Sequence, residues 1–296
     1  MKISKNICSK LVLHLCPPIR VHSWGGFGSQ LFALVALHKL ERKYPYRKLK
    51  LVFHTGGVTY RNIEVRNEMI PYRFTVVDDF RTKEFEYARV AKVERVKKAG
   101  RPTIKILLKK LGILLGVISN MNDEVDFKDT KIGVVDVRGH YSKLEISREI
   151  ATYFLSMMSR GFSGPDTKSD SGTVHWRMGD LLELNDKGPI PASRIGSIMR
   201  FNDHIRNWTI FSDTGSNEAI IQLSSIPPDS TWNNPSSPEE TIVANLYSSI
   251  FIGTNSKISF WIAVFRSLAN PTGITYLPEE IEKSFSFPSF TSPEFY

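Results

Sequence analysis

Cysteine is scarce in this chain of 296 residues. The two cysteines, Cys8 and Cys16, follow neither a Cys-x-x-Cys pattern nor the Cys/His spacing that is typical of zinc sites. This pattern excludes a disulfide-framed secreted module and a zinc finger, and it predicts a protein of a reducing cytoplasm.

Long apolar runs are also missing. No stretch approaches the about 20 apolar residues that span a bilayer, and "LVLHLC" (11–16) is short and broken by His14. The segment "PTIKILLKKLGILLGVI" (102–118) is apolar on most sides with clustered lysines. It predicts either a helix lying on an anionic membrane surface or a buried helix with a lysine edge. We therefore expect a cytoplasmic protein that is soluble or peripheral at the inner face of the membrane.

The residues that are present suffice for a sizeable core, with 41% hydrophobic and 23% charged residues, and the length favours two domains. The formal charge of +9 indicates an anionic partner, such as nucleic acid, an acidic membrane or a phosphorylated substrate, or simply a basic surface. No aromatic RNA-binding signature or helix-turn-helix pattern occurs, so nucleic acid is not the expected partner.

Short β-branched runs alternate with segments of helical period along the whole chain. The predicted strands are 19–24, 48–55, 74–80, 131–139, 172–177, 208–213, 248–254 and 273–278. The predicted helices are 29–44, 144–160, 193–205, 238–249 and 257–269. This alternation predicts an α/β fold with mainly parallel sheets. A Gly/Ser/Pro/Asp-rich break at 159–173 divides it into Rossmann-like domains at 1–162 and 163–296.

Ligands of such folds bind where strands end and helices begin. Near the N-terminus, "GGFGSQLF" (25–32) places Gly26, Gly28 and Ser29 between a predicted strand and a helix. Glycines there allow a positive φ and close approach of a ligand, although the stretch has neither GxGxxG nor a Walker lysine. A structural tight turn is the alternative interpretation.

The stretch "HWRMGD" (175–180) ends the first predicted strand of the second half. Arg177 is suited to a diphosphate, because its planar guanidinium donates two parallel hydrogen bonds and stays charged. Asp180 could hold the arginine or the turn at Gly179. The alternatives are a core histidine at His175 and a purely structural ion pair between Arg177 and Asp180.

Two later strands also end in polar clusters. "FSDTGSN" (211–217) presents Ser212 and Asp213, and "IGTNSKISFW" (252–261) presents Thr254, Asn255 and Ser256. Hydroxyls and free N–H groups at a helix start can bind phosphate without a metal, and ordinary helix capping is the alternative.

These four stretches, in this order, resemble the HxRxGD fucosyltransferases, most closely the α-1,2-fucosyltransferase family. The family's segments read GGxGNQ, HxRRGDY, FSDD and an NSTFSWW-like run, and "VVDVRGHYSKLEI" (134–146) resembles a further family stretch. The resemblance spans about residues 21 to 278. It implies a GT-B fold of two Rossmann-like domains facing across a cleft. It also implies inverting, metal-independent transfer of a 6-deoxyhexose, usually L-fucose from GDP-L-fucose, with no cofactor.

By matching position, the resemblance implies that Arg177 binds the donor β-phosphate, with His175 and Asp180 in support. It also implies a role at the nucleotide or its cleft for several further residues: Gly26, Gly28, Ser29, Ser212, Asp213, Thr254, Asn255 and Ser256. Glu183 and Asp186 are candidates for the general base, or they are solvated loop acids.

The sequence departs from the family pattern at four positions: Ser29, Met178, Thr214 and Ile262. These departures leave GDP-colitose or another nucleotide sugar open as the donor, and they leave open a transferase fold that has lost activity. The implied partners are a nucleotide-sugar donor and a glycan or lipid-linked oligosaccharide acceptor of surface polysaccharide or O-antigen synthesis. The basic surface would then face the membrane.

Overall fold

Two parallel sheets, each in its own unit of the chain, carry the fold, which confirms the predicted α/β class. The computed structural model describes residues 19–24, 26–44, 49–54, 85–88, 111, 114, 136–159, 170–178, 188–214, 225–235 and 237–296. The chain divides into Met1–Leu144 and Glu145–Tyr296. Each unit is described by itself.

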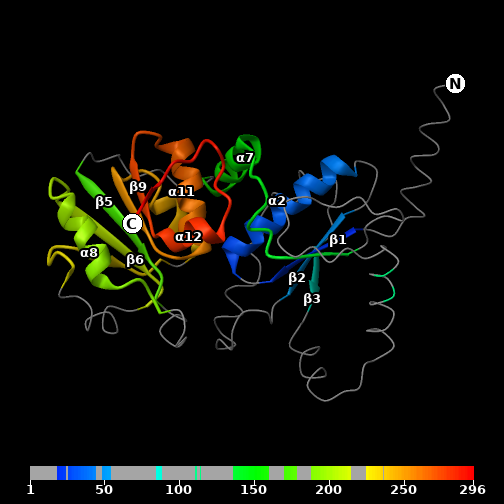
Figure 1. The fold of residues 1–296 in the computed structure, drawn as a ribbon, viewed down its shortest axis with the longest axis horizontal. Helices are drawn as coiled ribbons and strands as arrows, with labels where there is room; N and C mark the ends of the chain where they lie inside the picture. Colours follow the sequence, from blue (N-terminus) through cyan, green and yellow to red (C-terminus); the bar gives the residue numbers. More distant parts are fainter. Residues whose placement is uncertain are drawn as a thin grey trace, which may run out of the picture. The chain divides into compact units, whose positions relative to one another are not determined.

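The N-terminal unit contains a four-stranded sheet in the order β3-β2-β1-β4, with every pair parallel. The strands are β1 (Ile19–Trp24), β2 (Leu49–His54), β3 (Phe85–Ala88) and β4 (Asp136–Arg138). Helix α2 (Phe27–Lys43) joins β1 to β2 and packs along both (Figure 1). Its apolar residues are buried over nearly the whole length, as expected of a helix that connects two parallel strands and packs on their sheet.

Tyr141, just past β4, is the only non-glycine residue with a positive φ among those described, at 58°. Its hydroxyl oxygen lies 2.8 Å from the carbonyl oxygen of His22 and 2.9 Å from that of Val137. The buried side chain therefore ties the end of β4 to β1. These contacts offset the cost of the left-handed backbone conformation.

The C-terminal unit contains a six-stranded parallel sheet in the order β10-β9-β8-β5-β6-β7. Its strands are β5 (Ser171–Trp176), β6 (Asn207–Ser212), β7 (Thr231–Asn233), β8 (Ile250–Gly253), β9 (Ile274–Leu277) and β10 (Glu294–Phe295). Its helices are α7 (Arg148–Met158), α8 (Ala192–Phe201), α10 (Pro238–Ala244), α11 (Lys257–Ala269) and α12 (Glu279–Ser284).

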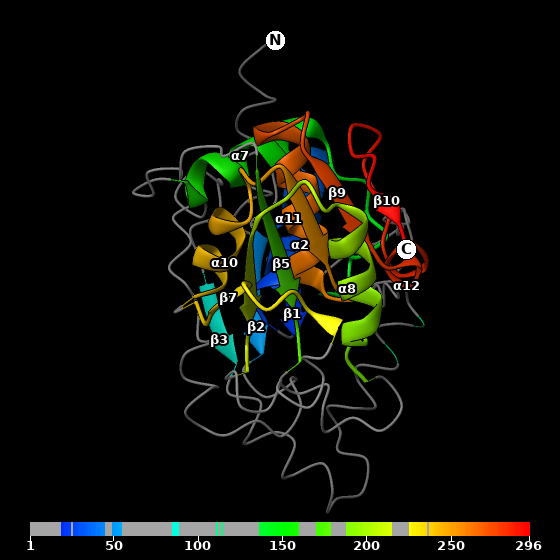
Figure 2. The ribbon, with the colours of Figure 1, turned by 90° about the vertical axis from the view of Figure 1, so that its left-hand side faces the viewer.

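Helix α8 lies on one face of this sheet and α11 on the other (Figures 1 and 2). Along β5, Val174 and Trp176 enter the apolar core that α8 covers, together with Ile195 of that helix. The intervening His175 points the other way and bonds to Ser259 of α11. Because successive side chains of a strand point to opposite faces of the sheet, His175 lies on the face that α11 covers.

Helix α7 belongs to the C-terminal unit, because Phe154 packs edge-on against Trp261 of α11 with ring centroids 6.0 Å apart. The structure therefore divides the chain before α7, whereas the sequence placed the boundary after it, at 162/163. The glycine-rich break that suggested 162/163 follows α7 within the same unit. The helix itself begins at Arg148, because the Ser147 hydroxyl caps it by accepting the Ile150 N–H at 3.4 Å.

Most predicted elements that fall on described residues are confirmed to within a few residues. The predicted strand 74–80 lies outside the described residues, and only Leu111 and Leu114 of the segment 102–118 lie within them. Four short elements were not predicted: β3, β7, β10 and α12. Within the described residues, no helix combines the length and the hydrophobicity required to cross a bilayer.

A buried arginine bonds to the main chain at the amino edge of the larger sheet, opposite the edge at which its strands end. Arg266 of α11 is 1% exposed, and burial lowers its pKa to about 9, so it is still charged at neutral pH. Its guanidinium also lies 5.6 Å from the centre of the Phe251 ring. It donates hydrogen bonds of 2.8 to 3.2 Å to oxygens of Asn245, Leu246, Ser248, Ile274 and Thr275. One side chain thus satisfies the main-chain carbonyls that enter β8 and β9.

Replacing Arg266 with Met should lower the free energy of unfolding of the C-terminal unit by about 3 kcal/mol, because several buried carbonyls lose their donor together. Tryptophan fluorescence during urea unfolding measures this, since the unit contains Trp176, Trp208, Trp232 and Trp261. The matched control Arg206→Met alters an exposed arginine and should change the value little. Equal stability of the two variants would contradict the role of Arg266.

Candidate functional site

The exits of β5, β6 and β8 lie next to one another at the carboxyl edge of the larger sheet. The register pairs His175 with Phe211 on one side and with Gly253 on the other. The segments that follow these strands therefore begin at the same level. The structure thus brings together Arg177, Asp213 and Thr254, which lie up to 77 residues apart in sequence.

Two hydrogen bonds fix the main chain as it leaves β5. The Arg177 N–H donates to the Thr254 hydroxyl at 3.1 Å, and the Met178 N–H donates to a carboxylate oxygen of Asp213 at 2.8 Å. The Thr254 hydroxyl in turn donates to the His175 carbonyl at 3.0 Å. The exit of β5 is therefore held from both neighbouring strands, with the half-buried side chain of Arg177 starting from this fixed point.

His175 lies buried under the first turn of α11. Its Nδ1 is 2.7 Å from the Ser259 hydroxyl and 3.5 Å from the Ser256 hydroxyl. Burial lowers the pKa of the imidazole to about 4; the negative charge of Asp213 opposes this effect and the positive charge of Arg177 adds to it. His175 is therefore neutral at physiological pH and adds no charge to the site.

The hydroxyl contacts define the tautomer of His175. Ser259 Oγ accepts the Thr254 N–H at 3.0 Å and the Ser256 hydroxyl at 3.2 Å. Its own proton is then left for Nδ1 of His175, so the imidazole carries its proton on Nε2. The histidine thus acts in this network as an acceptor that orders the hydroxyls beneath the helix start.

The segment Thr254–Ser256 forms the start of α11. Ser256 is the N-cap, and its hydroxyl accepts the Ser259 N–H at 3.0 Å. The hydroxyls of Thr254 and Ser256 are both occupied by bonds within the protein, whereas the side chain of Asn255 is exposed. We infer that Thr254 and Ser256 shape the helix start, where N–H groups and the helix dipole favour an anion.

At the exit of β6, Ser212 is buried and its hydroxyl accepts the Thr214 N–H at 3.2 Å. This is a local turn bond made by a hydroxyl two residues earlier in the chain. The contact that reaches across the site comes from Asp213, through the Met178 N–H. Asp213 thus supports the exit of β5, and a direct contact of Ser212 or Asp213 with a ligand stays a prediction.

Met178 stands where the family pattern has a second arginine. Its side chain is 1% exposed and belongs to the apolar core under α8. A guanidinium there would be buried among apolar side chains, so methionine suits this environment. Asp180, Glu183 and Asp186 lie outside the described residues, and their predicted roles stay predictions.

The glycine stretch of the N-terminal unit precedes α2. Gly26 is the N-cap with φ −72°, and Gly28 and the buried Ser29 lie in the first turn of the helix. Gly26 therefore does not use the positive φ that a glycine allows, and Gly25 lies outside the described residues. No side chain caps this helix start, and the Ser29 N–H bonds to the Gly26 carbonyl at 2.9 Å. Ligand binding by Gly26, Gly28 and Ser29 stays a prediction.

Ser259 is a site residue that the sequence reasoning missed. It links His175, Thr254 and Ser256, and it is fully buried. Its spacing of three residues from the N-cap Ser256 is the spacing of a capping box, which could have pointed to it. Within the described part of the chain, no three His, Cys, Asp or Glu side chains gather in a way that could hold a metal ion.

Comparison with known proteins gives structural neighbours but no sequence relatives. No protein-family model and no curated protein matches the chain. Among solved structures, a glycosyl transferase family 9 protein from Veillonella parvula aligns with a TM-score of 0.44 and 12% identity over 95% of this chain and 86% of its own.

Two other neighbours align at similar levels. The E. coli heptosyltransferase WaaC, solved with ADP, gives a TM-score of 0.45 and 10% identity over 94% of this chain and 93% of its own. The fucosyltransferase NodZ from Bradyrhizobium gives 0.41 and 14% identity over 86% of this chain and 94% of its own.

The neutral His175 predicts a specific dependence of stability on pH. The pKa is about 4 in the folded chain against 6.5 unfolded, so between these pH values the unfolded chain binds more protons. The free energy of unfolding should therefore fall as the pH drops from 6.5 to about 4, by up to about 3 kcal/mol from this group.

Urea unfolding of wild type and His175→Gln across this pH range measures the difference in slope. The variant should be less dependent on pH, whereas His204→Gln, which changes an exposed histidine of the same unit, should retain the wild-type slope. Parallel curves for wild type and His175→Gln would refute the buried neutral state.

Proposed function

We propose that this chain is a GT-B glycosyltransferase that binds the diphosphate of a nucleotide-sugar donor at the carboxyl edge of its larger sheet. The observation that carries the proposal is the bonded framework of the β5, β6 and β8 exits, in which Thr254 and Asp213 hold the main chain of Arg177 and Met178. The main chain of Arg177 is bonded to Thr254, two residues before the N-cap of α11. An arginine and a helix start are both suited to bind phosphate oxygens.

Arg177 is the residue that we assign to the leaving group. In an inverting transfer, an acceptor hydroxyl attacks the anomeric carbon while the bond from that carbon to the β-phosphate oxygen breaks. A general base takes the hydroxyl proton, and the departing diphosphate takes the negative charge. A guanidinium fixed near that oxygen stabilises the developing charge without requiring a metal ion.

The acceptor side is assigned by resemblance. Glu183 and Asp186 follow Arg177 closely in sequence and are the candidates for the base, whereas Asp180 would support the arginine. The acceptor that we propose is a glycan or lipid-linked oligosaccharide of a surface polysaccharide or O-antigen. The net charge of +9 supports peripheral contact with an anionic membrane that carries it.

The donor that the motif order supports best is GDP-L-fucose, transferred in an α-1,2 linkage. The stretches "GGFGSQLF", "HWRMGD", "FSDT" and "TNSKISFW" follow one another as in the α-1,2-fucosyltransferases. GDP-colitose or another nucleotide sugar is the second candidate, because Ser29, Met178, Thr214 and Ile262 depart from that pattern.

Calorimetric titration of the full chain with GDP, UDP and dTDP tests the donor class. We expect GDP to bind more tightly than the other two, with the same affinity in the presence and absence of EDTA. Loss of binding in EDTA would overturn the metal-independent mechanism. Salt-dependent binding of random DNA without binding of any nucleoside diphosphate would overturn the proposed function.

Arg177→Ala should lower turnover of the nucleotide sugar by about 100-fold or more, because the departing diphosphate loses its cationic donor. The matched control is Arg206→Ala, which removes the same charge from an exposed position of the same unit. Initial rates with GDP-L-fucose and a panel of glycan acceptors, read by mass spectrometry, give the comparison. Equal activity of the two variants would remove Arg177 from the mechanism.

A further inference from the structure

The last residues of the chain fold back onto the end of the sheet that carries the candidate site. The rings of Phe285 and Phe287 pack on Phe260 of α11, with centroids 4.9 and 4.8 Å away. Strand β10 then pairs with β9 so that Phe295 lies opposite Leu277, the last residue of that strand. The next residue, Tyr296, is thereby placed at the carboxyl edge of the sheet.

Tyr296 bonds directly to the strand that leads into the site. Its hydroxyl donates to the carbonyl of Gly253, the last residue of β8, at 2.8 Å. The β8–β9 ladder ends one residue earlier, where Ile252 lies opposite Tyr276, so the tyrosine continues the bonding of β8 past the ladder. Burial raises the pKa of Tyr296 above its ordinary value, so the hydroxyl keeps the proton that it donates.

Space around Gly253 is also restricted. A Cβ on this residue would lie 2.5 Å from Leu277 Cδ2 and 2.8 Å from Ser259 Cβ. The peptide is thus enclosed by β9 and α11, and the Tyr296 hydroxyl bonds to its carbonyl. Little freedom is left to the residue that follows, Thr254, whose hydroxyl accepts the Arg177 N–H.

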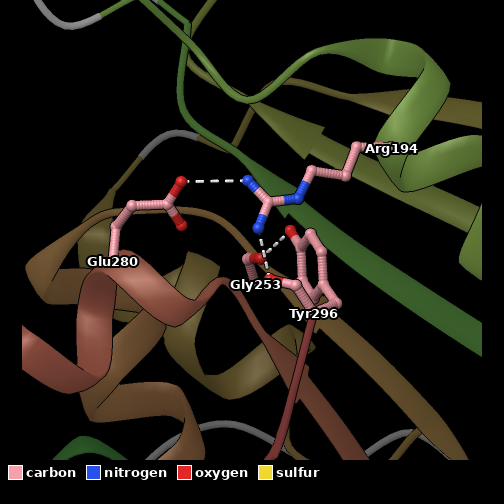
Figure 3. A network of polar contacts seen from close by, with 4 residues as sticks. All are labelled: Arg194, Gly253, Glu280 and Tyr296. Carbon is pink, nitrogen blue, oxygen red and sulfur yellow. Dashed lines mark hydrogen bonds and ion pairs between the residues drawn. The ribbon is translucent and has the colours of Figure 1, made fainter.

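Arg194 of α8 holds Tyr296 in this position (Figure 3). Its Nη2 donates to the main-chain oxygen of Tyr296, and its guanidinium lies 5.0 Å from the centre of the tyrosine ring. Its Nη1 bonds to Glu280 Oε1 at 3.0 Å, where both side chains are partly exposed. An exposed ion pair of this kind contributes little to stability. The contacts of Arg194 that constrain the tyrosine are therefore those with its main-chain oxygen and its ring.

We propose that Tyr296 is a positioning residue for the diphosphate subsite. It acts through one short series of contacts, from its hydroxyl to Gly253, then along the main chain to Thr254, and from the Thr254 hydroxyl to the main chain of Arg177. The inference rests on the proposed function and assigns to that site a residue that lies 43 positions after Gly253 in sequence and is held in place by helix α8.

Tyr296→Phe tests this inference, because it keeps the ring under Arg194 and removes only the hydroxyl. Calorimetry with the nucleoside diphosphate that wild type binds, GDP, UDP or dTDP, should show Kd raised about fivefold, the equivalent of one hydrogen bond. In turnover assays, KM for the nucleotide sugar should rise while kcat changes less. A merely structural role would instead lower the melting temperature and the active fraction, with Kd and KM unchanged.

The matched control is Phe290→Leu. Phe290 belongs to the same terminal segment, and the guanidinium of Arg148 lies 4.8 Å from the centre of its ring. It should loosen the segment and leave Kd at the wild-type value. Arg194→Ala should raise Kd as Tyr296→Phe does. The Kd of the double variant should not exceed the higher Kd of the two single variants, because both substitutions act through the contact between Tyr296 and Gly253.

Three outcomes would overturn the inference. Equal Kd for wild type and Tyr296→Phe would remove the tyrosine from the site while leaving the proposed function intact. The same rise in Kd for Phe290→Leu would show that general loosening of the segment is the cause. If wild type binds none of the three diphosphates, the proposed function fails as well, so the two failures are distinguishable.

Discussion

Two hydrogen bonds from main-chain N–H groups to side-chain oxygens at the exit of β5 determine where the candidate site can be. Thr254 and Asp213 come from the strands on either side of β5, and they accept the N–H groups of Arg177 and Met178. Because the donors are main-chain N–H groups, these bonds fix the direction of the chain at Arg177 and Met178. The placement of the arginine therefore depends on the register of three parallel strands.

The same register explains why polar groups are buried at this edge without loss of stability. His175, Ser256 and Ser259 are each less than 9% exposed, yet each has hydrogen-bond partners within the network. A neutral imidazole avoids the cost of a buried charge beside Arg177. The network thus holds the start of α11 in a fixed position through buried hydrogen bonds. A preorganised arrangement of this kind allows a site to bind an anion without reorganising.

The structure accounts for two of the departures from the resembled pattern, Met178 and Thr214. Met178 is a core residue under α8, so apolar packing occupies the position at which the resembled pattern has a second arginine. The Thr214 hydroxyl lies 3.1 Å from the Ser212 hydroxyl, a local contact that does not need a carboxylate. One arginine then remains in the described part of the "HWRMGD" stretch, which concentrates the proposed chemistry on Arg177.

The sequence alone determined the class of fold and the order of the elements. Apolar periodicity and turn residues are local signals, and they sufficed for the long strands and helices, for the capping role of Ser256 and for the choice of Arg177 as a candidate. They did not reveal the short elements β3, β7, β10 and α12, whose formation depends on neighbours that are distant in sequence.

Only the tertiary structure decided which residues act together. That Thr254 and Ser256 use their hydroxyls within the protein, that Ser259 connects them to His175, and that Tyr296 reaches Gly253 are consequences of strand register and of the packing of the terminal segment. Contacts between residues 43 to 84 positions apart leave no periodic trace in the chain, because they arise from how sheets and helices pack and not from local conformation.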